Sequence, residues 1–202
     1  MSIPGAFLIT PDQLSDERGA FYELRCDMLE RAVGVPFQPQ QINYSVSKRH
    51  TLRGIHSVSI PPGQAKLVTC VRGALRDIVV DLRIGSPAFG AHQVTELDAV
   101  SGRSVYVPEV WGTDSSRSPT TPVSATSSPS TYVPGTQIDI NPLDPDLDLP
   151  WDCPQEPLIS EKDAKASSLA EALASGTLPD LHDCRTSDAA RTALVRAPSE
   201  RQ

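Results

Sequence analysis

Proline and glycine interrupt this chain so often that its first 150 residues can form only short elements. The 202 residues include 19 prolines and 12 glycines, and the pieces between them are rich in valine, isoleucine, leucine and threonine. Short apolar runs separated by turn residues at intervals of roughly eight to twelve positions are typical of antiparallel sheets. The pattern therefore predicts an all-β fold, a jelly roll or barrel made of two antiparallel sheets.

The expected elements fill one domain at residues 1–179. Strands are predicted at residues 7–10, 19–24, 41–47, 51–57, 65–71, 74–82, 90–97, 104–107 and 137–140, and a short helix at 27–33. Leu169, Leu173 and intervening alanines have helical spacing and are followed by Gly176, which predicts a short C-terminal helix. Residues 180–202 are polar with little periodicity, so we expect a disordered tail.

Composition excludes several classes of protein. The formal net charge is -7, and no stripe of lysine and arginine offsets it, so a protein that binds the phosphate backbone of nucleic acids is not expected. No apolar run approaches the roughly 20 residues of a membrane helix. The first residues lack the pattern of a secretory signal, which predicts a cytoplasmic protein. Four widely spaced cysteines indicate isolated thiols rather than a zinc site or a disulfide framework.

Seven segments of the chain occur in a characteristic order: DERGAFYE (16–23), LRGIH (52–56), QAKLV (64–68), VDLR (80–83), SPAFG (86–90), VPE (107–109) and SEKDA (160–164). This set of segments resembles the dTDP-4-dehydrorhamnose 3,5-epimerase family of the cupin superfamily. The likeness spans roughly residues 5 to 179. It implies a cupin-type jelly roll, a double-sheet antiparallel barrel, that acts as a homodimer without metal or organic cofactor.

The resemblance also implies a reaction and the residues that carry it. Family members invert carbon 3, carbon 5 or both in a dTDP-4-keto-6-deoxyhexose during dTDP-deoxysugar biosynthesis. Removing a proton beside a ketone needs a positioned base and a fixed positive charge or donor for the enolate oxygen. By motif, His56 is that base, Asp163 orients and charges it, and Lys66 meets the enolate. The implied substrate-binding residues are Arg18, Glu23, Gln41, Asn43, Arg53 and Tyr132.

Taken without the family, the same residues have simpler interpretations. A single histidine in a strand is usually structural, and Asp163, three residues after Ser160 at the start of a helix, fits a capping arrangement. The neighbouring Arg53 and Lys66 favour the catalytic interpretation of His56. Asp144, Asp146 and Asp148 lack the glycine and distal glutamate of a calcium loop and indicate an acidic loop.

One segment departs from the family. After VPE the family continues with a histidine and then an apolar strand that carries its general-acid tyrosine, whereas this chain has Thr113 and Thr126 there, inside a Ser/Thr/Pro run at 110–130. The run predicts a loop of about 20 residues. Its three prolines would also break a central strand ladder. If the coding DNA is read from the third base of each codon, every threonine codon yields Asn, Asp, His or Tyr, and both family residues that are missing here stand at a threonine. We therefore hypothesise a compensated pair of frame changes that brackets roughly residues 110–130.

The departure leaves other functions open. A cupin that binds a sugar nucleotide without turnover would also fit, since the family's acid is replaced. A metal-dependent cupin oxygenase or isomerase is disfavoured, because His50 and His56 do not form the His-x-His ligand pattern of metal-binding cupins.

Overall fold

A five-stranded antiparallel sheet forms one layer of the molecule. The computed structural model describes residues 1–108, 111–112, 121–153 and 156–196. In the order in which they pair, the strands of this sheet are β1 (Phe7–Ile9), β9 (Ser104–Val107), β6 (Lys66–Arg72), β11 (Val123–Ser128) and β4 (Gln41–Val46). Each pair in the sheet is antiparallel, as predicted.

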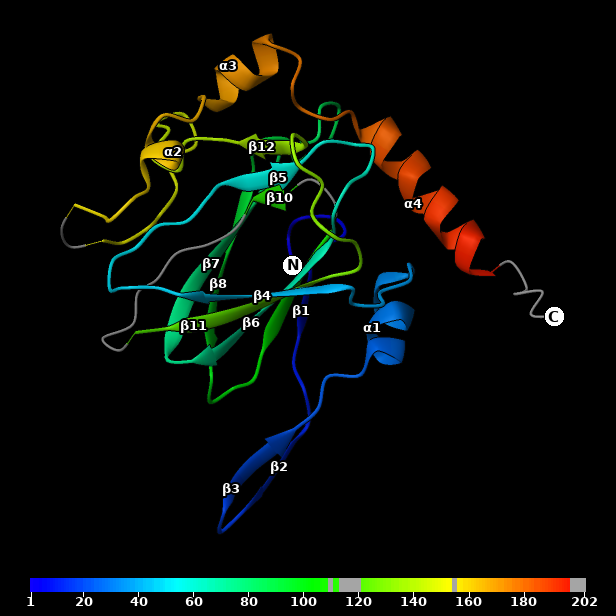
Figure 1. The fold of residues 1–202 in the computed structure, drawn as a ribbon, viewed down its shortest axis with the longest axis vertical. Helices are drawn as coiled ribbons and strands as arrows, with labels where there is room; N and C mark the ends of the chain where they lie inside the picture. The colour runs from blue at the N-terminus through cyan, green and yellow to red at the C-terminus, as the bar shows by residue number, and fades with distance from the viewer. Residues whose placement is uncertain (109–110, 113–120, 154–155, 197–202) are drawn as a thin grey trace.

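The opposite layer is made of two smaller sheets. One has the order β10 (Trp111–Gly112), β7 (Ala74–Asp81) and β8 (His92–Asp98), and the other pairs β12 (Gln137–Asp139) with β5 (His56–Val58). Strand β10 lies beside β5, so the two sheets adjoin (Figure 1). Strands β2 (Gln13–Asp16) and β3 (Gly19–Tyr22) form a hairpin that projects away from both layers (Figure 1).

Alternating side chains divide the apolar core among the faces of these sheets. Val68 of β6, Val79 of β7 and Val105 of β9 are buried in one cluster, so the two layers pack face to face. The other face of β7 presents Ile78 and Val80 to a second cluster, which the C-terminal segments cover. This period of two is what a sheet that is buried on both faces requires. The predicted all-β architecture is therefore confirmed.

Four helices lie outside the sheets in the described part of the chain. Helix α1 (Cys26–Val33) covers β6 and β9 through Leu29 and ends at Gly34, whose φ of 79° suits glycine. Helices α2 (Glu161–Ala164) and α3 (Leu169–Ala174) begin at Ser160 and Ser168, whose side chains accept backbone N–H groups. No helix in the described ranges is long and apolar enough to cross a membrane.

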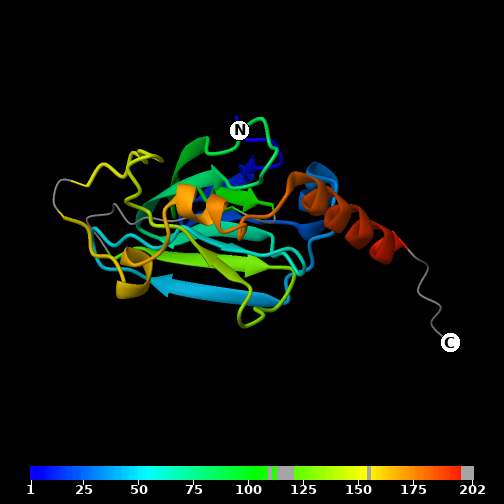
Figure 2. The same ribbon diagram turned by 90° about the horizontal axis from the view of Figure 1, so that it is seen from above.

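Helix α4 (Leu181–Arg196) corrects the expected disordered tail. The Leu181 amide donates to the Ile84 carbonyl at 2.9 Å, and Cys184 is buried against the outer face of the second layer. The rest of α4 extends away from the sheets (Figure 2). Cys184 is the only fully buried side chain among those described in α4, so the apolar pattern of the helix is weak, which is why the sequence did not predict it. Residues 197–202 lie outside the described part.

Strand β11 corrects the expected 20-residue loop. It occupies a central position in the five-stranded sheet, between β6 and β4, with Thr126 opposite Val68 and Asn43. Pro122 and Pro129 lie immediately outside the strand, so neither removes an N–H group from its ladder. Its alternate hydroxyl side chains face a polar cavity, so the apolar periodicity of an ordinary buried strand is absent. Pro119 lies outside the described residues.

Candidate active site

A polar cavity of about 330 Å³ lies between the two layers. Its floor is one face of the five-stranded sheet, because strands β4, β11 and β6 each contribute every second side chain to it. Strand β5 and the segments near β12 form the facing wall. The residues that line it are Gln41, Asn43, Ser45, Arg53, His56, Ser57, Val58, Gln64, Lys66, Val68, Thr126, Ser128, Tyr132 and Gln137.

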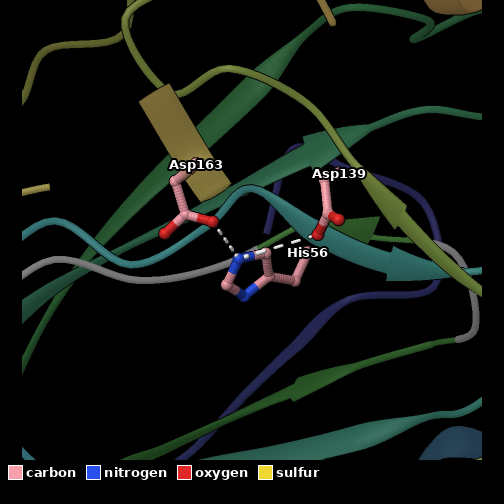
Figure 3. Close-up of side chains that lie close together, drawn as sticks. All are labelled: His56, Asp139 and Asp163. Atoms are coloured by element: carbon pink, nitrogen blue, oxygen red, sulfur yellow. Dashed lines mark hydrogen bonds and ion pairs between the residues drawn. The ribbon is translucent and has the colours of Figure 1, made fainter. Parts of the chain in front are cut away.

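His56 and Asp163 form a hydrogen-bonded pair at this wall (Figure 3). The Nε2 atom of His56, the first residue of β5, lies 2.6 Å from Oδ1 of Asp163 in α2. Ser160 caps α2 by accepting the Asp163 amide at 3.0 Å, so the capping interpretation is correct for the backbone. The carboxylate of the same residue is free to reach His56. Asp163 therefore serves the cap of α2 through its backbone amide and binds His56 through its carboxylate.

The environment of Asp163 keeps its carboxyl group ionised. Burial opposes ionisation, but the hydrogen bond and charge of His56, with hydrogen bonds from Ser160 and the Gly54 backbone, lower the pKa of Asp163 below its ordinary value of 3.8. An ionised carboxylate only accepts, so Nε2 carries the hydrogen of this bond. The lone pair of a neutral ring is then on Nδ1, which points away from the carboxylates (Figure 3).

Asp139 is a site residue that the sequence analysis missed. Strand β12 pairs with β5 so that Asp139 is directly opposite His56, and its Oδ1 lies 3.8 Å from Nε2 (Figure 3). Lys162 of α2 donates to the same Oδ1 at 2.8 Å. These ligand-type atoms of His56, Asp139 and Asp163 lie within 4.8 Å of one another. Because hydrogen bonds from the ring and from Lys162 already use them, we assign no metal to these three residues.

Most of the other predicted residues reach the same cavity. Lys66 of β6 donates from Nζ to the His56 carbonyl oxygen at 2.9 Å, which places its ammonium group beside β5. Arg53 donates from Nε to Ser47 Oγ at 2.9 Å. Gln41 Oε1 accepts the Tyr132 amide at 2.8 Å, so β4 fixes the chain segment that carries this aromatic ring. Together with Asn43, these residues surround the space in front of His56.

The two departures from the family pattern fall differently in the structure. Thr126 lines the cavity from the floor, where β11 holds it between Val68 and Asn43. Position 126 therefore shares the space that His56 faces, although it holds a hydroxyl that does not titrate near neutral pH. Thr113 lies outside the described residues.

Arg18 and Glu23 are not brought to this cavity within one chain. Arg18 lies at the turn of the β2–β3 hairpin, where it pairs with Asp16 and its side chain is 90% exposed. Glu23 follows β3 and lines a separate, more apolar hollow together with Leu14, Phe21 and Met28. The two residues are separated from the cavity because the hairpin projects from the body of the molecule (Figure 1). The order of residues in the sequence does not indicate this projection.

Comparison with known proteins identifies the family of this chain. Residues 1–171 match the model of a family described as dTDP-4-dehydrorhamnose 3,5-epimerase. The chain belongs to the dTDP-4-dehydrorhamnose 3,5-epimerase family. It is 44% identical to a dTDP-4-dehydrorhamnose 3-epimerase of Streptomyces niveus over 92% of this chain and 89% of the relative. It is 42% identical to a dTDP-4-dehydrorhamnose 3,5-epimerase of Mycolicibacterium smegmatis over 92% of both chains.

Solved structures of epimerases share the fold of this family member. The crystal structure of NovW, a 4-keto-6-deoxy sugar epimerase from the novobiocin cluster of Streptomyces spheroides, matches with a TM-score of 0.88 at 44% identity, over 91% of this chain and 92% of NovW. ChmJ, a 3'-monoepimerase from Streptomyces bikiniensis solved with dTDP-quinovose, matches with a TM-score of 0.91 at 39% identity, over 96% and 98%. The predicted cupin-type jelly roll is thereby confirmed, although the described strands form separate sheets rather than one closed barrel.

Proposed function

We propose that this protein is an isomerase that epimerises a dTDP-4-keto-6-deoxyhexose at carbon 3, carbon 5 or both. The observation that carries the proposal is the His56–Asp163 pair, held at 2.6 Å on the wall of a polar cavity that also contains Lys66. Relatives named for 3-epimerisation and for 3,5-epimerisation cover nine-tenths of the chain, which supports the substrate class. Residues 1–179 form the catalytic domain in this proposal.

The first step is removal of a proton from the carbon beside the ketone. Nδ1 of His56 takes the proton, and the electrons of the broken C–H bond form an enolate with its charge on the former carbonyl oxygen. The ammonium group of Lys66 meets that oxygen. Asp163 stabilises the imidazolium that results, since a buried carboxylate beside Nε2 favours the charged ring. Arg53, Gln41, Asn43 and Tyr132 bind the sugar and diphosphate.

Inversion requires the second proton to arrive from the opposite face of the sugar. Thr126 lies on the cavity floor, across from the wall that carries His56, but its hydroxyl is too weak an acid to protonate an enolate quickly. We infer that proton removal by His56 is faster here than inversion. Exchange of hydrogen with solvent then exceeds formation of the epimer.

A second copy of the chain completes the binding site in this proposal. Leu14 and Phe21 of the hairpin are 69% and 63% exposed, and Ile42, Tyr44 and Val46 are exposed on β4, an edge strand of the five-stranded sheet. Exposed apolar side chains on an unpaired edge favour association with another chain. A homodimer that covers them lets the projecting hairpin carry Arg18 to the partner subunit's cavity, and places Glu23 at the interface.

Deuterium incorporation tests the proposal. The protein is incubated with dTDP-4-keto-6-deoxyglucose in deuterated water, and label at carbons 3 and 5 is followed by NMR and mass spectrometry. Label at either carbon, lost in a folded His56→Asn variant, is the expected result. A folded protein that introduces no label at either position, while still binding the nucleotide sugar, would refute epimerisation.

A further inference from the structure

Asp139 and Lys162 form an ion pair directly beside the imidazole of His56. The Asp139 Oδ1 atom lies 2.8 Å from Lys162 Nζ and 3.8 Å from His56 Nε2. The Asp139 and His56 side chains are 22% and 30% exposed, so water screens their interaction only in part. Figure 3 shows Asp139 and Asp163 on the same side of the ring, facing the nitrogen that Asp163 already binds.

The fold fixes this ion pair from three directions. The register of β12 on β5 places Asp139 opposite His56, and the side-chain Nε2 of Gln137 donates to Asp139 Oδ1 at 2.7 Å. Lys162 precedes Asp163 in α2, so one short helix supplies both the carboxylate that binds the ring and the ammonium group that binds Asp139. Asp139 is thus held toward His56 and is not a freely rotating surface side chain.

Charge around the ring depends on this pairing. On the Nε2 side lie the carboxylates of Asp163 and Asp139 and the ammonium of Lys162. On the cavity side lie Lys66, which donates to the His56 carbonyl, and Arg53, which donates to Ser47. With Lys162 in place, Asp139 is neutralised and one uncompensated carboxylate faces the imidazole. Without Lys162, two would face it, and the charged ring would be stabilised further.

We propose that the Asp139–Lys162 pair is a positioning unit for the epimerase reaction, in which Lys162 cancels the charge of Asp139 so that Asp163 alone stabilises protonated His56. This inference rests on the proposed function. The pair touches neither substrate nor reacting atoms and acts through the ring. A base must release its proton again within each turnover, and a second uncompensated carboxylate would retain it.

The proposal predicts opposite effects for the two single variants. Lys162→Met leaves Asp139 uncompensated, so the acid limb of kcat/KM for deuterium exchange moves to higher pH by about half a unit. Asp139→Asn removes the anion and leaves the Lys162 ammonium near the ring, so the limb moves to lower pH by a similar amount. The double variant returns close to the parent protein. Loss of packing alone would not move the acid limbs of the two single variants in opposite directions.

The matched control and an activity-independent readout make the test decisive. Lys165→Met removes a neighbouring lysine at the C-cap of the same helix, which pairs with Glu161 on the surface, and leaves the acid limb unchanged. NMR titration of the His56 ring in the substrate-free protein must show the same opposite displacements. Because this titration needs no turnover, it still tests the pair if epimerisation itself fails. Displacements in the same direction, or none in either single variant, would overturn the proposal.

Discussion

Replacing Asp163 by asparagine separates its two roles in the structure. The asparagine keeps the backbone amide that Ser160 Oγ accepts at 3.0 Å, so the cap of α2 remains. It removes the negative charge that lies 2.6 Å from His56 Nε2 in a side chain that is only 6% exposed. What is lost is therefore the stabilisation of the imidazolium that forms when His56 takes a proton.

The size of the loss follows from the strength of that bond. A hydrogen bond between charged groups contributes about 1.5–3 kcal/mol. Since each 1.36 kcal/mol in the barrier corresponds to a factor of ten in rate, kcat for deuterium exchange should fall about 10- to 150-fold. The amide can also donate to Nε2 and move the ring hydrogen to Nδ1, which would enlarge the effect.

The assay compares exchange rates at equal amounts of folded protein. Circular dichroism and thermal unfolding establish the folded fraction, and deuterium entry at carbons 3 and 5 gives the rate. Ser168→Ala serves as the control, because it removes the capping box of α3 at a cost of about 1 kcal/mol in stability without approaching His56. An exchange rate in folded Asp163→Asn equal to that of the parent would show that the carboxylate has only a structural role.

Three further measurements test other parts of the structure. Because the folded-state pKa of Asp163 lies below its ordinary 3.8, its ionised form stabilises the fold at higher pH. The difference in unfolding free energy between the parent and Asp163→Asn should thus shrink as the pH falls below 3.8, because protonation of the carboxyl group removes its contribution; a difference that grows as the pH falls below 3.8 contradicts this. Thr126→Tyr places a phenol on the cavity floor and should raise the yield of inverted product per exchange event about tenfold or more, as measured by NMR; an unchanged ratio would remove position 126 from the protonation step. Burial raises the pKa of the Cys184 thiol to about 11, so iodoacetamide at pH 8 should label Cys184 much more slowly than Cys26, and equal labelling by mass spectrometry would show that α4 is not docked.

The fold and the central residues were accessible from the sequence because their signals are local. Turn residues and apolar runs predicted strands such as β6 and β7 near their observed positions, and the LRGIH and SEKDA segments identified His56 and Asp163. The prediction missed strand β11 because its hydroxyl side chains face a polar cavity, which removes the apolar alternation used to recognise a strand. The prediction missed helix α4 because Cys184 is the only fully buried side chain among those described in it, which leaves little apolar periodicity.

The sequence by itself determined the all-β class, the family resemblance and the chemical types needed for proton transfer. Only the tertiary structure decided which of those side chains meet. His56 and Asp163 are 107 positions apart, and Asp139 reaches the ring through the register of β12 on β5. Arg18 belongs to the same resemblance, yet the hairpin carries it away from the cavity of its own chain. Local patterns record the preferences of neighbouring residues, whereas strand pairing and packing across the core set these distances.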